Sequence, residues 1–432
     1  DVGSRQWIPR FESDLDPHWR VGRALRVALL VVLTFIPFFG IYSEIARSIF
    51  GGSPMAYLIV IPGLAAMIAF GYRTPPRGVG DPESDWILAA IFGGLGLFLR
   101  HLMSNRFPTL SGLWHLPLVG AVLWAACLAA VLFGVRRVMQ TWPLWTFVLA
   151  TATPLPYLLV TAAAGGGTVV AASVTGLIGG IAVALAGTLS PPRRRLGVAA
   201  TVAVLGVAVG FAAAGLDHLP HSGLVVALLT GGVIPVSGFV FLHAGAPRPD
   251  TVRKPAWPRR SLASLIALCL GAVLVFVLNL PFGSAPVAPV RAEPNWPARL
   301  GIPAVQSFPF IARYLGSGAT FVRHAVRSRP GYPEAAVDVI TADNLAVLRT
   351  YGDAIWYPAT VPPNYRVLDL PGAVVSARAA ATDSSLATSA DARDWYVVTW
   401  VWETAETYQQ IFVVVNQTWT SQAPPLEPAP LS

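Results

Sequence analysis

Residues 169–187 read VVAASVTGLIGGIAVALAG, a run of nineteen residues without a single charged side chain. About 17 to 25 apolar residues in a helix are enough to cross the hydrocarbon core of a bilayer. The glycines and alanines of this run would also let neighbouring helices approach closely in lipid. The stretch therefore predicts a membrane-spanning helix in the middle of a helical bundle.

Windows of similar length and apolarity lie on both sides of this run, and together they make nine predicted spans. Apolar residues make up 54% of the 432 residues and charged residues only 12%, whereas soluble domains contain roughly 25% charged residues. We therefore predict an α-helical polytopic membrane protein and exclude a soluble globular enzyme. The predicted spans cover residues 24–42, 55–71, 86–103, 113–134, 143–163, 167–189, 196–215, 223–244 and 261–281.

Basic residues are concentrated in alternate loops between these spans. If the N-terminus is cytoplasmic, the inner segments carry 17 Lys and Arg residues, and the outer loops carry only 3, namely Arg47, Arg100 and Arg106. Such an excess on one side sets the orientation of membrane proteins. The net charge of +8 is therefore interpreted as contact with lipid headgroups and not with nucleic acid. We predict a multi-pass protein of the cytoplasmic membrane whose C-terminal part lies outside the cytoplasm.

The segment after the last predicted span has the composition of a folded domain, with a net charge of −2 over residues 285–432. The prolines between residues 281 and 297 favour extended chain over helix and predict a linker. We expect a cytoplasmic segment 1–23, a transmembrane bundle 24–281, a Pro-rich linker 282–297, an extracytoplasmic α+β domain 298–424 and a tail 425–432.

The clearest β signal in that domain is the pair WYVVTWVWE (395–403) and YQQIFVVVN (408–416), joined by residues 404–407. Runs rich in Val, Trp and Tyr on either side of a short polar segment are typical of a β-hairpin. The remaining pattern predicts helices within 305–328 and at 343–352, the second with Asp343 as its N-cap. It also predicts a strand at 336–341 and a flexible loop at 382–394.

Ionisable side chains gather in the predicted outer loops. They are Glu44 and Arg47 in the first loop, Arg100, His101, Arg106 and His115 in the second, and Asp217, His218 and His221 in the fourth. Two imidazoles and a carboxylate within the segment DHLPH (217–221) could act with Glu44 as a general base, hold a divalent metal, or be ordinary interfacial residues. The candidate catalytic residues are Glu44, Asp217, His218 and His221, and no cofactor or metal is assigned.

The sequence also argues against several classes of membrane protein. No charged residue lies near the centre of a predicted span, which disfavours ion-coupled transport. No GxxxxGK[ST] segment is present, which excludes a P-loop ATPase. Cys127 and Cys269 lie in apolar runs and form neither a disulfide framework nor a zinc motif. Tryptophans near span ends, among them Trp124, are expected to be interfacial anchors.

The order of features in residues 55–245 resembles the exosortase/archaeosortase family of multi-span membrane proteins, which process sorting signals at the outer membrane face. The resemblance is carried by YLIVIPGLAAMIAFGYR (57–73), by the Pro-Leu-Pro step in WTFVLATATPLPYLLV (145–160), by the small-residue run 169–187 and by DHLPHSG (217–223). The C-terminal domain is similar to the domain that some exosortases carry. The resemblance implies a Cys, Arg and His catalytic set.

This chain departs from that set at two of the three positions. Thr175, Gly176 and Leu177 match the Ser-Gly-Leu-like step of the family, but Val174 stands where the resemblance implies the nucleophilic cysteine. A valine cannot form a thioester. The arginine that the resemblance implies is absent, and Asp217 lies near its expected place. The histidine is retained as His218 or His221. Ser173 and Thr175 are the hydroxyls that could substitute for the cysteine.

Two functional hypotheses follow from these observations. The first is a non-catalytic, exosortase-like bundle of the bacterial cell envelope that presents an extracytoplasmic binding domain to membrane lipids and other envelope membrane proteins. The second is a membrane-embedded transferase or transpeptidase that acts at the outer membrane face on a lipid-linked or sorted substrate, with Glu44 as its acid. A third reading, a transporter subunit, is disfavoured by the uncharged spans. The missing cysteine favours the first hypothesis.

Overall fold

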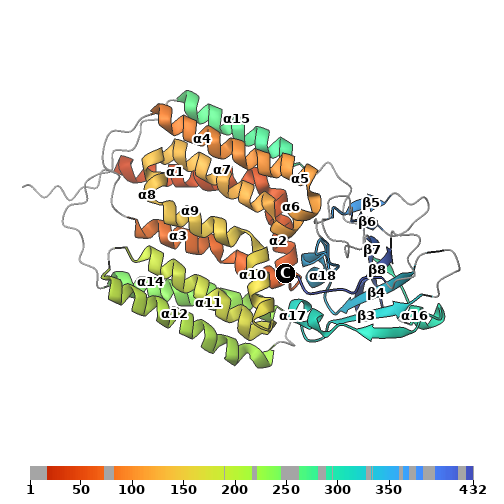
Figure 1. Ribbon diagram of the computed structural model, residues 1–432. Helices are drawn as coiled ribbons and strands as arrows, with labels where there is room; N and C mark the ends of the chain where they lie inside the picture. Colours follow the sequence, from red (N-terminus) through yellow and green to blue (C-terminus); the bar gives the residue numbers. More distant parts are fainter. Residues whose placement is uncertain are drawn as a thin grey trace, which may run out of the picture.

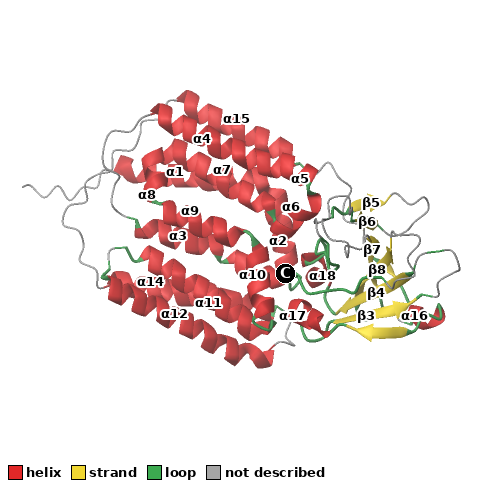
Figure 2. Ribbon diagram, in the orientation of Figure 1, coloured by secondary structure: helices red, strands yellow, loops and turns green. Residues whose placement is uncertain are grey.

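The computed structural model describes residues 17–72, 82–188, 190–216, 221–244, 262–280, 289–293, 295–326, 332, 334–359, 363–368, 376–382, 395–416 and 425–431. A bundle of helices and a sheet domain lie end to end (Figure 1). The described strands all belong to the sheet domain, and the bundle is entirely helical (Figure 2).

Fifteen numbered α-helices, α1 to α15, make up the bundle. Short 3₁₀ turns connect or interrupt them at Ile36–Phe38, Pro54–Ile59 and Ala214–Leu216, and π-helical turns do so at Phe98–Met103 and Leu229–Val233. The α-helices are α1 Pro17–Phe35, α2 Phe39–Phe50, α3 Ile61–Gly71, α4 Pro82–Leu97, α5 Ser104–Arg106, α6 Pro108–Trp114, α7 Leu116–Phe133, α8 Val135–Gln140, α9 Trp142–Ala152, α10 Pro154–Ala163, α11 Gly167–Ala186, α12 Pro192–Ala213, α13 Ser222–Leu228, α14 Ile234–Ala244 and α15 Leu262–Asn279.

Eight helical stretches among the described residues are long and apolar enough to cross a membrane. A ninth span results if the bent pair α9 and α10, which meet at an angle of 65°, is counted as one. The chain therefore has the architecture of a multi-pass membrane protein. The eight stretches are Ala24–Phe50, Pro54–Gly71, Glu83–Arg106, Leu116–Phe133, Gly167–Ala186, Pro192–Ala213, Ser222–Ala244 and Leu262–Asn279.

The small residues of α11 allow the close packing that the sequence predicts. A Cβ atom added at Gly176 would lie 2.8 Å from the Cα of Gly206 in α12, a distance that real Cβ atoms do not adopt. Only glycine therefore fits at this crossing of the two helices. The helix also packs against α3 and α14, so that it is enclosed on several sides.

Two prolines interrupt helices inside the bundle, and aromatic side chains repair the backbone at both places. Pro37 has no N–H to donate to the Leu33 carbonyl, and the Trp124 indole N–H donates to that carbonyl instead, at 2.9 Å. Trp124 is thus buried in α7 and is not the interfacial anchor that the sequence predicts. In the last turn of α9, shortly before Pro154, the Tyr57 hydroxyl donates to the Thr151 carbonyl at 3.1 Å.

Arginines at the end of the bundle far from the sheet domain bond to the last carbonyls of its helices (Figure 1). Arg26 donates to the carbonyl of Leu132 at 2.7 Å, and Arg194 donates to that of Phe241 at 3.0 Å. Arg137 donates to the Tyr72 carbonyl. Cations at helix C-termini satisfy unpaired carbonyls and complement the helix dipole. The basic residues of this end therefore also cap helices.

The sheet domain contains an eight-stranded, mostly antiparallel sheet of order β2-β3-β4-β8-β7-β6-β5, with β1 parallel to one end of β7. The hairpin predicted from the sequence is confirmed as β7 and β8, the two central strands. The elements are β1 Val290–Arg291, α16 Trp296–Arg299, β2 Ala304–Ser307, α17 Ala312–Leu315, β3 Thr320–Ala325, β4 Ala335–Ala342, α18 Leu345–Thr350, β5 Arg366–Leu368, β6 Ala377–Ala381, β7 Trp395–Glu403 and β8 Tyr408–Asn416.

Several predictions for this domain are wrong. In the described part of the range 305–328, which ends at residue 326, the chain forms strands β2 and β3 with only short helical turns between them, because β3 pairs along its whole length with β4. The N-cap of α18 is Asn344, whose side-chain oxygen accepts from the Ala346 N–H at 2.7 Å, and not Asp343. Part of the predicted linker folds as β1 and α16. The predicted loop at 382–394 lies outside the described residues except for Thr382.

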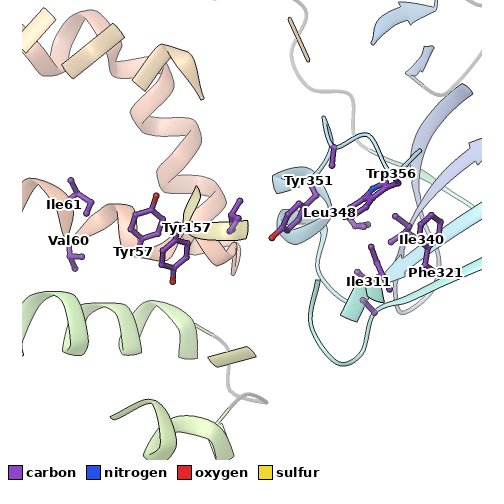
Figure 3. Close-up of a cluster of buried hydrophobic side chains, with 14 of the residues drawn as sticks. Tyr57, Val60, Ile61, Tyr157, Ile311, Phe321, Ile340, Leu348, Tyr351 and Trp356 are labelled. Atoms are coloured by element: carbon purple, nitrogen blue, oxygen red, sulfur yellow. The ribbon is translucent and has the colours of Figure 1, made fainter. Parts of the chain in front are cut away.

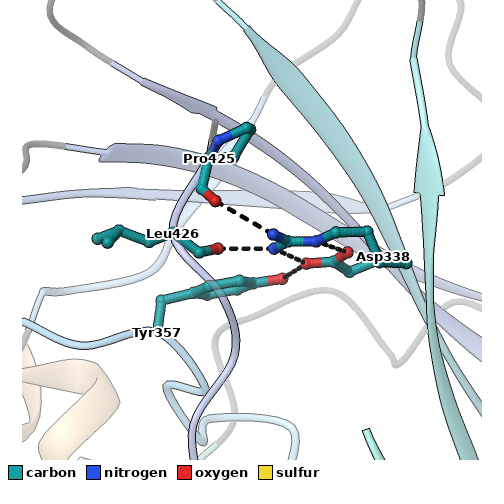
Figure 4. Close-up of polar contacts among 5 residues, drawn as sticks. Asp338, Tyr357, Pro425 and Leu426 are labelled. Carbon is teal, nitrogen blue, oxygen red and sulfur yellow. Dashed lines mark hydrogen bonds and ion pairs between the residues drawn. The ribbon is translucent and has the colours of Figure 1, made fainter. Parts of the chain in front are cut away.

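The predicted tail is instead held in the domain by a buried ion pair (Figure 4). The Arg323 guanidinium donates through Nε and Nη2 to the two carboxylate oxygens of Asp338, both at 2.7 Å, and Tyr357 donates to the same carboxylate at 2.8 Å. Nη1 and the second N–H of Nη2 donate to the carbonyls of Pro425 and Leu426, at 3.1 and 2.6 Å. Four of the five guanidinium N–H groups thus find acceptors, which offsets the cost of burying the charge.

Replacement of Asp338 by Asn should destabilise the protein by about 3 to 5 kcal/mol, because a buried guanidinium loses its charged partner. The surface pair of Glu293 and Arg299 provides the control, since both side chains are mostly exposed. Glu293→Gln should cost less than about 1 kcal/mol. Denaturant unfolding of both variants in detergent measures the difference, and equal losses would contradict the structural role of the buried pair.

Candidate functional site at the junction of bundle and sheet domain

Among the described residues, three hydrogen-bonded contacts join the sheet domain to the end of the bundle at which the two parts meet. The Asn344 amide donates to the Gly51 carbonyl at 2.6 Å, just after α2. The hydroxyls of Ser53 and Thr350 are 2.8 Å apart and buried. The Tyr365 backbone N–H donates to the Thr109 hydroxyl of α6 at 2.7 Å, where both residues are buried.

Apolar side chains continue across the junction, so that one core cluster includes both parts of the chain (Figure 3). On the bundle side, the rings of Tyr57 and Tyr157 stack with their centroids 4.0 Å apart. On the domain side, Tyr351 lies at the end of α18 that faces the bundle, ahead of Trp356 and Phe321 (Figure 3). The domain is therefore packed on the bundle and not merely tethered to it.

A carboxylate and a guanidinium of the domain lie against α6. Arg378 of β6 donates to Asp353 and to the Gly352 carbonyl, both at 2.6 Å, and its guanidinium lies 5.1 Å from the centre of the Tyr365 ring. The Asp353 carboxylate touches the Cα of Gly112, where an added Cβ would collide with it. The close approach explains why glycine occupies this position in α6.

His115, between α6 and α7, is the titratable group of the bundle that faces this carboxylate. Its backbone is left-handed, with φ of 50°, which is uncommon for a residue with a side chain. Its Nδ1 atom is buried and has no hydrogen-bond partner among the described residues. Burial lowers the pKa of His115, while the Leu113 carbonyl and the charges of Asp353 and Glu44 act in the opposite direction.

The structure places the residues predicted for the outer loops mostly on helices. Glu44 and Arg47 are exposed on α2, which continues the first span to Phe50. Arg100 and His101 lie in the π-helical turn after α4, and Arg106 ends α5. The first span extends further than predicted, to Phe50, because a helix can continue through polar residues where it leaves the hydrocarbon region.

Of the predicted catalytic set, the structure describes only Glu44 and His221. Asp217 and His218 lie outside the described residues. His221 is exposed, and no hydrogen bond or ion pair in the described part of the chain joins it to Glu44. The charge of Glu44 acts on His115 instead. The described residues contain no group of three His, Cys, Asp or Glu side chains suited to a metal ion.

The hydroxyls that could replace the cysteine are engaged within their own helix. Ser173 donates to the Val169 carbonyl, and Thr175 donates to the Ala171 carbonyl, both at 2.7 Å. The Thr175 hydroxyl is also 3.2 Å from that of Tyr157. A hydroxyl nucleophile needs a base within hydrogen-bond reach, and the groups around these two are carbonyls and a neutral phenol. Neither is placed as a nucleophile.

Sequence reasoning missed the electrostatic influence of Asp353 on His115, although it noted His115 as a rim residue. The two residues are 238 positions apart, and no local pattern links them. The signal that could have found the site is the pair of glycine and histidine, Gly112 and His115, at a helix end. A buried imidazole that feels the charges of two carboxylates titrates differently from a free one, so the junction can respond to pH.

Comparison of the chain with protein families, with curated proteins and with solved structures finds no match. The resemblance to exosortases therefore stays an expectation from the sequence.

The lowered pKa of His115 predicts a pH dependence of stability. The folded junction prefers the neutral imidazole. The free energy of unfolding therefore keeps its full value above the unfolded pKa of about 6.5 and decreases as the pH falls below that value. His115→Asn removes the titrating group, and asparagine tolerates the left-handed backbone. The melting temperature in detergent should fall more steeply between pH 8 and pH 5 for the wild type than for this variant.

His221→Asn is the matched control, since His221 also has a positive φ, of 65°, but is exposed. This variant should keep the pH profile of the wild type. Identical profiles for wild type and His115→Asn would show that His115 does not titrate with unfolding.

Proposed function

We propose that the chain is a multi-pass protein of the bacterial cytoplasmic membrane whose bundle anchors and orients an extracytoplasmic domain that binds other envelope proteins. The cytoplasmic position of the N-terminus is supported by the excess of basic residues in alternate loops. Rigid presentation is supported by the core and the polar contacts that bundle and domain share.

The observation that carries the binding role is a tryptophan cluster on the sheet face opposite the bundle. Trp400 and Trp402 alternate along β7 with the core residues Val397 and Thr399, so that they point away from the buried face. Trp296 and Trp402 both donate to the Gln409 side-chain oxygen, at 2.9 and 3.0 Å. Their rings meet edge to face at 5.0 Å.

This tryptophan cluster, residues 296, 400 and 402, has the properties of a protein-binding surface. Tryptophan is enriched at the centres of interfaces because it buries a large area at little entropic cost. The Trp400 indole N–H is buried and has no hydrogen-bond partner in the described part of the chain.

A non-catalytic role agrees with the engaged hydroxyls of Ser173 and Thr175 and with Val174 in the place of a cysteine. The alternative is a transferase or transpeptidase acting at the outer face of the membrane on a lipid-linked or sorted substrate. One observation favours it, namely that the charges of Glu44 and Asp353 act on a buried histidine. The acid and base of such an enzyme would then be Glu44 and His115.

The orientation can be measured by cysteine labelling in a background with Cys127→Ala and Cys269→Ala. Val367 of β5 is 73% exposed and Met139 of α8 is 59% exposed, at opposite ends of the molecule. A membrane-impermeant maleimide should label the Val367→Cys variant in spheroplasts and the Met139→Cys variant only in inverted vesicles. The reverse pattern would overturn the orientation.

The binding role can be tested with a photo-crosslinking amino acid in intact cells. Placed at Trp402, it should yield a discrete adduct with an envelope protein, and at Val367, on the edge strand β5, it should not. The adduct should also survive Glu44→Ala combined with His115→Ala, because binding does not use these groups. An adduct at both positions or at neither would argue against the tryptophan cluster as the binding surface. Loss of the adduct in the Glu44→Ala and His115→Ala double variant would favour the transferase.

A further inference from the structure

Residues 425–431, with the sequence PLEPAPL, lie on the sheet domain as an extended segment that belongs to no helix or strand. Side-chain burial along the segment repeats every three residues, since Pro425 and Pro428 are buried while Glu427 and Pro430 are exposed. A polyproline II helix has three residues per turn, and its carbonyls are free to accept because it has no internal hydrogen bonds. The three prolines and the burial pattern therefore indicate a polyproline II helix.

The domain donates hydrogen bonds to the free carbonyls at both ends of this segment. The Arg323 guanidinium donates to the carbonyls of Pro425 and Leu426 at 3.1 and 2.6 Å (Figure 4). The Tyr314 hydroxyl of α17 donates to the Leu431 carbonyl at 3.3 Å. These bonds are made to the main chain, so any extended segment with the same backbone path could accept them.

Two leucines give the segment its side-chain contacts. Leu426 and Leu431 pack against the core cluster that the domain shares with the bundle. Between them, the Ala429 N–H donates to the Trp356 carbonyl at 2.7 Å. The sequence requirement of this arrangement is therefore a proline-rich chain with leucines five positions apart.

We propose that the surface formed by Tyr314, Arg323 and Trp356, here called the segment site, binds proline-rich segments of other proteins. Residues 425–431 are then its intramolecular occupant, which a partner segment displaces. The partner segment carries proline at its first and fourth positions and leucine at its second and seventh, as residues 425–431 do. Proline-rich segments suit such recognition because the polyproline II helix is preformed and loses little entropy on binding.

The buried guanidinium explains why one segment would replace another and not simply leave. Arg323 is 6% exposed, so departure of residues 425–431 alone would leave two of its N–H groups without acceptors, which is costly. An incoming segment supplies equivalent carbonyls, and the ion pair of Arg323 with Asp338 is kept throughout. The exposed side chains of Glu427 and Pro430 show that the segment lies at the surface, where a partner can reach it.

The segment site is separate from the tryptophan cluster, and the proposal does not rest on that cluster. Arg323 faces Asp338 across β3 and β4, Asp338 is in register with Phe412, and Phe412 is in register with Thr399. All four therefore lie on one face of the sheet. Trp400, next to Thr399 along β7, lies on the other face because successive side chains of a strand alternate.

The test measures the binding of a fluorescent PLEPAPL peptide to the full chain in detergent by fluorescence anisotropy. In the wild type, residues 425–431 compete at a high effective concentration and reduce the apparent affinity. Leu426→Ala combined with Leu431→Ala removes the side-chain contacts of the occupant and should raise the affinity for the peptide at least about tenfold. Glu427→Gln is the matched control, because it changes an exposed side chain of the same segment, and it should bind as the wild type does. A double variant that binds no more tightly than the wild type would overturn the proposal.

A second measurement keeps both leucines and so does not depend on the folding of the double variant. A photo-crosslinking amino acid in place of the exposed Pro430 should join residue 430 to the sheet domain of the same chain. An excess of PLEPAPL should reduce this crosslink, and the same peptide with alanine for both leucines should not. A crosslink that PLEPAPL does not reduce would show that residues 425–431 are a fixed part of the fold and would overturn the proposal. Covalent dimers would mean that a second copy supplies the segment, which overturns its assignment to other proteins.

Discussion

Backbone carbonyls in the interior of an apolar bundle must find hydrogen-bond donors within the protein, because neither lipid nor apolar side chains offer any. At Pro37 and at the end of α9, where the helices break, Trp124 and Tyr57 supply donors to the carbonyls of Leu33 and Thr151. The breaks are therefore stable bends and not weak points. The elements that follow them, α2 and α10, are also those that contact α18 and α17 of the sheet domain. The repaired bends shape the surface on which the domain rests.

The helical part of the fold could be predicted from the sequence because an apolar run of sufficient length has few alternatives to a helix. The sequence pattern did not show where such a helix bends, since the repair of a proline break depends on a residue from another helix, as with Trp124 and Leu33. In the sheet domain, β7 and β8 were recognised from their own composition. Strand β3 was not, because its six residues become a strand through pairing with β4.

The candidate site was predictable only as a group of residues at one end of the bundle. Glu44 and His115 were recognised as rim residues, but their acidic neighbour Asp353 comes from a part of the chain that the sequence does not connect to them. The same limit applies to Arg100, whose partner Asn279 lies 179 positions away. Local patterns report which side chains reach the end of a helix, whereas packing decides which of them meet.

The contacts between bundle and domain lie on separate elements, and this arrangement determines how the domain can be used. Asn344 is bonded after α2, Tyr365 is bonded on α6, and Arg313 of α17 touches Gly166 before α11. Contacts to three separate elements of the bundle restrain the rotation of the domain as well as its position. A partner held on the far face of the sheet would therefore keep a fixed distance and orientation relative to the bundle. The shared apolar core resists separation, so the domain presents its tryptophan cluster as part of one rigid molecule.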